Sequence, residues 1–153
     1  MQSSSLQPPS TYAQWVSLLD LLKERSDDPN VLQAMQAGTI HWQDGVAERF
    51  SRKLIDAVNA RMNSAVDRFQ KEMSRSRGQE REIVSAILNL RNEMRFLSKA
   101  IRLPALPEKD RQSYYQLVLS QANSIQESLE KSAKTDRTGK LLSIIKTNRV
   151  NDL

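Results

Sequence analysis

The residues with reactive side chains are few, and their spacing does not assemble a catalytic site. The 153-residue chain has no cysteine and a single histidine, His41. Thiolate catalysis, disulfides, zinc–thiolate sites and multi-histidine metal centres are therefore excluded. The Glu-x-x-His pairs of di-iron bundles do not occur either. His41 lies in a short connection between Ile40 and Trp42, where packing or surface exposure explains it better than catalysis.

One segment near the C-terminus imitates a phosphate-binding loop without completing it. Gly139-Lys140 matches the end of the motif, but Lys134 stands where the first glycine is required. Leu141 stands where the motif needs Ser or Thr, and no strand precedes the segment. We therefore interpret the segment from Asp136 onward as a polar turn.

A second partial motif, Ser128-x-x-Lys131, lacks the companion motifs of the Ser-x-x-Lys hydrolases. On a helix with regular apolar spacing it is expected on the solvated face. The sequence consequently predicts a protein that is not an enzyme, with no catalytic residue, no cofactor or metal site, and no small-molecule substrate.

Basic side chains form a candidate binding surface. The chain has 23 Lys and Arg against 18 Asp and Glu, a formal net charge of +5. Six residues make up the candidate basic face: Arg77, Arg81, Arg91, Arg95, Lys99 and Arg102. Such a stripe could follow a phosphate backbone. Alternatively, these charges complement the dipole of the helix predicted over residues 79–102, with Glu80 and Glu82 in its first turn and Lys99 and Arg102 in its last. Phe96 is the only aromatic residue on that helix, whereas proteins that bind single strands use several rings for base stacking.

Apolar spacing places these residues on helices and shows no strand-type alternation. Residues 1–10 are expected to form a disordered leader. Thr11-x-x-Gln14 then has the form of a capping box that starts an amphipathic helix. Asp28 can cap a second helix, which is expected to stop at Gly38 in a left-handed conformation. Two short helices are therefore predicted within residues 11–38.

Three long helices are predicted over about residues 44–75, 79–102 and 108–134. On the first, the apolar spacing slightly exceeds the roughly 3.6 residues of a helical turn, so its two ends should contact different neighbours. The other two carry heptad seams typical of coiled-coil packing. These seams are Ile83, Ile87, Leu90, Met94, Leu97 and Ile101, and Tyr115, Val118, Ala122, Ile125 and Leu129. A turn with two prolines joins them, which predicts an antiparallel hairpin.

A short C-terminal helix is expected over residues 140–147, followed by a tail over residues 148–153. Its apolar residues form a candidate docking segment: Leu141, Leu142, Ile144 and Ile145. This segment either folds back onto the bundle or docks on a partner. Folding back is favoured, because that much apolar surface is rarely left exposed.

The sequence thus predicts an all-α fold: an antiparallel bundle of three long helices with short N-terminal helices packed on it, in one domain over residues 11–147. The expected function is a non-catalytic protein–protein interaction or adaptor module. The alternative is a nucleic-acid-associated regulatory protein that uses the basic face. Self-association as a homodimer fits the wrapping stripe of the first long helix. Without a signal-peptide pattern or a run of about 20 apolar residues, a cytoplasmic location and no membrane partner are expected.

Overall fold

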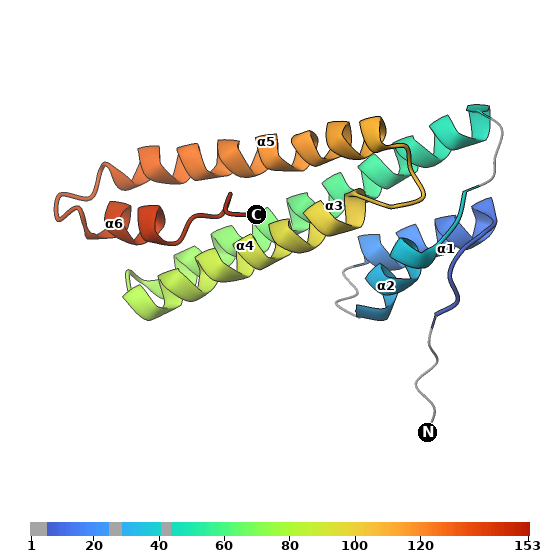
Figure 1. The fold of residues 1–153 in the computed structure, drawn as a ribbon. Coiled ribbons are helices and arrows are strands. Elements are labelled where there is room, and N and C mark those ends of the chain that lie inside the picture. Colours follow the sequence, from blue (N-terminus) through green and yellow to red (C-terminus); the bar gives the residue numbers. More distant parts are fainter. Residues whose placement is uncertain (1–5, 25–28, 41–43) are drawn as a thin grey trace, which may run out of the picture. The chain divides into compact units, whose positions relative to one another are not determined.

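The computed structural model describes residues 6–24, 29–40 and 44–153, and in this part of the chain all regular secondary structure is helical (Figure 1). The helices are α1 (Tyr12–Lys23), α2 (Pro29–Ala37), α3 (Asp44–Ser76), α4 (Glu80–Ile101), α5 (Glu108–Ala133) and α6 (Lys140–Thr147). The all-α prediction is confirmed, and the helix bounds agree closely with the expected ones. Asp28, His41 and Trp42 lie outside the described residues.

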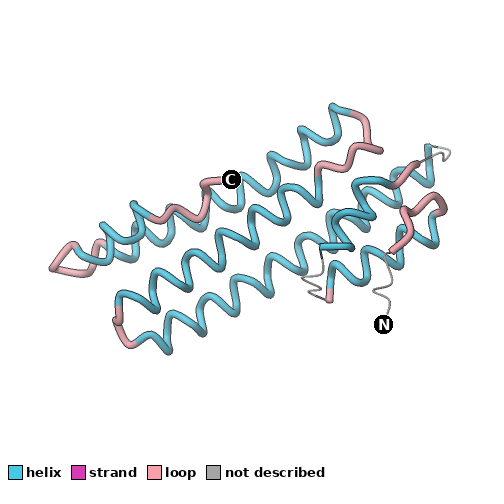
Figure 2. The backbone as a smooth tube through the Cα atoms, turned by 60° about the horizontal axis from the view of Figure 1, so that its bottom comes forward, coloured by secondary structure: helices cyan, strands magenta, loops and turns pink. Residues whose placement is uncertain are grey.

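The chain divides into two compact units. The first contains the residues up to Arg61 together with Lys99–Tyr115, and the second contains Met62–Ser98 and Gln116–Leu153. Short turns join α3 to α4 and α4 to α5 (Figure 2), as the glycine and proline positions predict. Because α3 contributes to both units, its two ends have different neighbours, as its wrapping stripe predicts. The single domain over residues 11–147 stays a prediction.

Trp15 is the centre of the first unit. Its side chain is fully buried, and its ring meets Phe50 of α3 edge-on with 5.1 Å between the ring centroids. The indole Nε1–H donates to the carbonyl oxygen of Thr39 at 3.0 Å, so the polar atom is satisfied as well. At the start of the same helix the predicted capping box is present, with Thr11 and Gln14 bonded reciprocally. This aromatic contact ties α1 to α3 and to the segment after α2.

Gly38 directly follows α2, but its role differs from the predicted left-handed helix stop. Its backbone is not left-handed; positive φ among the described glycines occurs at Gly78 and Gly139. A Cβ atom on Gly38 would lie 2.5 Å from Cζ2 of Trp15 and 2.8 Å from Cγ of Pro9. The missing side chain therefore makes room for the close approach of these two rings.

The expectation of a disordered leader over residues 1–10 is wrong for its end. Pro9 is buried, and its carbonyl oxygen accepts a hydrogen bond from the backbone N–H of Thr39 at 2.9 Å. Packing on Trp15 and Gly38 thus holds a segment whose composition alone suggests disorder. Residues 1–5 lie outside the described residues.

Arg61 of α3 is a buried charge in the first unit, with 1% of its surface exposed. Its Nη1 donates to the carbonyl oxygen of Leu22 at 3.4 Å, in the last turn of α1. Carbonyl groups at a helix C-terminus carry partial negative charge and favour a cation there. Sequence periodicity gave no indication of this contact, because its partner is 39 residues away.

The second unit is built on α3, α4 and α5. The six heptad positions of α4 are all buried: Ile83, Ile87, Leu90, Met94, Leu97 and Ile101, of which the last lies in the first unit. On α5, however, Val118, Ala122 and Gln126 are buried, while Tyr115, Ile125 and Leu129 are only half-buried. The heptad prediction is wrong at these three positions, and in the second unit the buried face of α5 is rotated towards Gln126.

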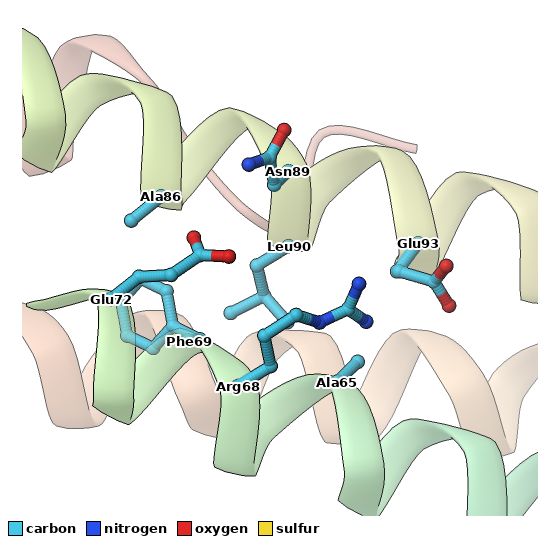
Figure 3. A pocket seen from close by; sticks show the side chains of 8 residues that line it. All are labelled: Ala65, Arg68, Phe69, Glu72, Ala86, Asn89, Leu90 and Glu93. Carbon is cyan, nitrogen blue, oxygen red and sulfur yellow. The ribbon is translucent and has the colours of Figure 1, made fainter. Parts of the chain in front are cut away.

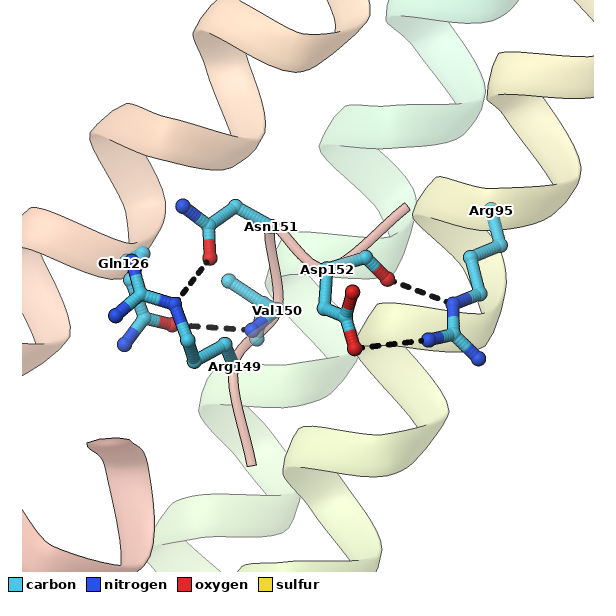
Figure 4. A network of polar contacts seen from close by, with 6 residues as sticks. All are labelled: Arg95, Gln126, Arg149, Val150, Asn151 and Asp152. Carbon is cyan, nitrogen blue, oxygen red and sulfur yellow. Dashed lines mark hydrogen bonds and ion pairs between the residues drawn. The ribbon is translucent and has the colours of Figure 1, made fainter. Parts of the chain in front are cut away.

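Gln126 is the polar member of this buried face. The residue is 1% exposed, and both ends of its amide bond the C-terminal segment; Figure 4 shows the bond to Val150. Nε2 donates to the carbonyl oxygen of Ile145 at 3.2 Å, and Oε1 accepts from the N–H of Val150 at 3.0 Å. Buried backbone polar groups require such partners. One glutamine thus holds both α6 and the residues after it against α5.

We expect Gln126→Leu to lower the free energy of unfolding by about 2–4 kcal/mol, since it leaves two buried backbone groups without partners. Urea unfolding of both proteins would measure the difference. Gln116→Leu is the matched control, because Gln116 is exposed on the same helix, and we expect it to change stability by less than about 0.5 kcal/mol. Equal losses in the two variants would contradict this role of Gln126.

Candidate functional site

The rotation of α5 leaves an open groove between α3 and α5 in the second unit. This α3/α5 groove has a volume of about 370 Å³. It is lined by Val66, Phe69 and Gln70 of α3 and by Ser124, Ile125, Ser128, Leu129 and Ser132 of α5. Its apolar floor therefore includes Ile125 and Leu129, two predicted core residues of α5 that the fold does not bury fully.

An adjoining side of α3 packs against α4. There, Phe69 and Leu90 pack between α3 and α4, and Arg68 and Glu93 lie to one side (Figure 3). The remaining cavity is only about 10 Å³, which is about the space that one water molecule needs. In the second unit, α3 thus packs closely against α4 and lines an open groove beside α5.

The α3/α5 groove has no charged lining residue, although 27% of the whole chain is charged. Ser124, Ser128 and Ser132 are exposed and recur every four residues, so they form one edge of the groove. Small side chains at this spacing allow another helix to approach closely. Apolar periodicity did not predict this groove, and the spacing of the three serines is the signal in the sequence that could have indicated it.

The predicted basic face is divided between the two units. Arg77, Arg81, Arg91 and Arg95 belong to the second unit, and Lys99 and Arg102 to the first. Arg95 is bonded to the C-terminal segment: its Nε donates to the carbonyl oxygen of Asp152 at 2.7 Å, and its Nη2 lies 3.2 Å from the Asp152 carboxylate. Arg102 lies over the ring of Tyr115, 4.4 Å from its centroid. Two of the six cations are therefore engaged within their own unit.

The predicted docking segment packs onto its own chain. Ile144 and Ile145 are buried, Leu141 and Leu142 are half-buried, and Val150 beyond them is fully buried. Folding back, the alternative that the sequence favoured, is what the structure contains. The two isoleucines are consequently core residues of the second unit.

The segment that imitates a phosphate loop is a helix cap. The Asp136 carboxylate accepts hydrogen bonds from the N–H of Leu141 at 3.1 Å and from the hydroxyl and N–H of Thr138. These bonds, chiefly that from Leu141, hold the pKa of Asp136 below its ordinary value of 3.8. The interpretation of a polar turn agrees with this geometry, in which a carboxylate already occupies the N-terminus of α6.

Two further observations concern metals and membranes. Among the described residues, no three His, Asp or Glu side chains lie close enough together to hold a metal ion. In the same part of the chain, no helix is both long and apolar enough to cross a membrane.

Ser128 and Lys131, the partial hydrolase motif, are both exposed, and Ser128 lines the α3/α5 groove.

Comparison with known proteins found no matching family model, no similar curated protein and no similar solved structure.

The Asp136 cap predicts a stability difference that depends on pH. Because its folded pKa is lowered, the carboxylate stabilises the fold above its unfolded pKa, and this contribution is lost as the pH falls through the folded pKa. We expect Asp136→Asn to be less stable than the natural protein at neutral pH, and the difference to shrink in acid. Urea unfolding between about pH 7 and about pH 2.5 would measure it.

The matched control for this prediction is Asp67→Asn, at an exposed aspartate of α3 in the same unit. A stability difference between Asp136→Asn and the natural protein that stays constant down to the lowest pH would contradict the proposed cap.

Proposed function

We propose that this protein is a non-catalytic interaction module, and that the α3/α5 groove is its docking surface. The observation that carries the proposal is an open, apolar groove on an ordered pair of helices. Amphipathic helices bind proteins by placing an apolar face into such grooves. The rim of serines and Gln70 supplies hydrogen-bonding groups around the apolar floor, as at many protein interfaces.

The proposed ligand is an apolar helix face without charges at its contact positions. A charged side chain placed over Val66, Ile125 and Leu129 would lose water without gaining an opposite charge from the lining residues. Specificity would then come from shape and from the serine hydroxyls. Nucleic-acid binding through the basic face stays a prediction, and the engagement of Arg95 by Asp152 reduces the free positive charge available for it.

Photo-cross-linking tests the proposed surface. We expect benzoylphenylalanine in place of Ser128 to give a discrete adduct with one protein, identified by mass spectrometry, when the protein is mixed with a cell extract. The same group in place of Ser85, an exposed serine of α4 in the same unit, is the matched control. The adduct should disappear when Ile125→Glu is added, provided that the helical circular dichroism spectrum is unchanged. Equal labelling from positions 128 and 85 would refute the docking surface.

A further inference from the structure

The face that contains the α3/α5 groove also carries a protruding apolar side chain. Leu117 of α5 is 48% exposed, and it is the only exposed large apolar residue in the part of the chain that the structure describes. Ser124 and Ser128 follow it by about two and three helical turns, so the three side chains leave α5 within about 40° of one another. All of these residues belong to the second unit. A protrusion and a groove therefore lie on one surface.

We propose that the occupant of the α3/α5 groove is a second copy of this chain, in a two-fold symmetric dimer where each Leu117 enters the groove of the other copy. The proposal rests on the proposed function, because it names the partner of the same surface. In a two-fold interface, a contact of residue i with residue j is repeated by j with i. A surface that holds both a protrusion and a groove can satisfy this condition with itself.

The spacing along α5 fits an antiparallel arrangement of the two copies. Leu117 precedes Ile125 by about 12 Å and Leu129 by about 18 Å along the helix axis. If two α5 helices cross in opposite directions with Leu117 over these residues, the two-fold axis passes between Gln121 and Asn123. The serine edge allows the helices to approach closely, because Ser124 and Ser128 lie on the side that faces the partner.

Charge also favours a second copy. Each chain has a formal net charge of +5, so two copies repel one another over most orientations. The α3/α5 groove has no charged lining residue, and Leu117 and Gln121 extend the uncharged face along α5. Two copies can therefore meet at this face without placing like charges opposite each other. A partner of opposite charge would find no ionic contact among the lining residues.

Sedimentation velocity tests the proposal directly. We expect the natural chain to shift from monomer to dimer as its concentration rises from about 1 µM to about 1 mM. Ser128→Glu should weaken the dimer at least about tenfold, because the symmetry places two buried charges in one interface. Leu117→Ser should also weaken it at least about tenfold, since each copy loses the side chain that fills the groove.

The matched control is Ser85→Glu, which makes the same substitution at an exposed helical position outside the groove. It should leave the dimerisation constant within about twofold, and circular dichroism should show that all variants remain helical. A chain that stays monomeric throughout the range would overturn the proposal. Equal weakening by Ser85→Glu and Ser128→Glu would overturn it as well.

Cysteine pairs test the arrangement of the two copies, because the chain has no cysteine of its own. A mixture of the Leu117→Cys and Ser128→Cys variants should form a mixed disulfide dimer on mild oxidation. Ser85→Cys mixed with Ser128→Cys is the control and should form at least about tenfold less, since a disulfide needs Cα atoms roughly 4.4–6.8 Å apart. Equal yields from the two mixtures would overturn the antiparallel arrangement.

The results separate this inference from the proposed function. A monomeric chain that gives a discrete adduct with a different protein from position 128 would refute the second copy and retain the docking surface. A monomeric chain without a specific adduct would refute both.

Discussion

The buried amide of Gln126 is the interaction on which the second unit depends. A chain that folds back over a bundle brings backbone N–H and C=O groups into the interior, and each of them requires a partner. Gln126 supplies an acceptor for Val150 and a donor for Ile145 from one side chain. An apolar residue at this position could fill the same volume, but it would leave both backbone groups unsatisfied.

The position of Gln126 also determines which surface of α5 stays open. With Gln126, Val118 and Ala122 facing the interior, Ile125 and Leu129 lie at the edge of the core and form part of the floor of the α3/α5 groove. The second unit thus has the C-terminal segment bonded to Gln126 on one side of α5 and the apolar α3/α5 groove on another side. The proposed function uses this opening, while an adjoining side of α3 packs closely against α4.

Several polar and charged residues of this chain serve local structure. The segment around Gly139 caps α6 through Asp136, because a carboxylate that accepts backbone N–H bonds stabilises a helix N-terminus. Arg61 acts at the other end of a helix, where its guanidinium group bonds a carbonyl oxygen in the last turn of α1. Arg95 and Arg102 of the predicted basic face contact Asp152 and Tyr115.

The sequence by itself determined the number, order and approximate bounds of the helices. The signals that predicted them are apolar periodicity, the Thr11 capping box, and the positions of glycine and proline. Each of these acts over a few neighbouring residues, so it can be recognised from the sequence without knowledge of the fold. The heptad spacing also predicted the buried side of α4, but tertiary structure alone decided which side of α5 is covered. The partners of Gln126 lie 19 and 24 residues away, and that of Arg95 lies 57 residues away. Such contacts depend on which distant segments lie close together in space, and local patterns in a single sequence do not predict that proximity.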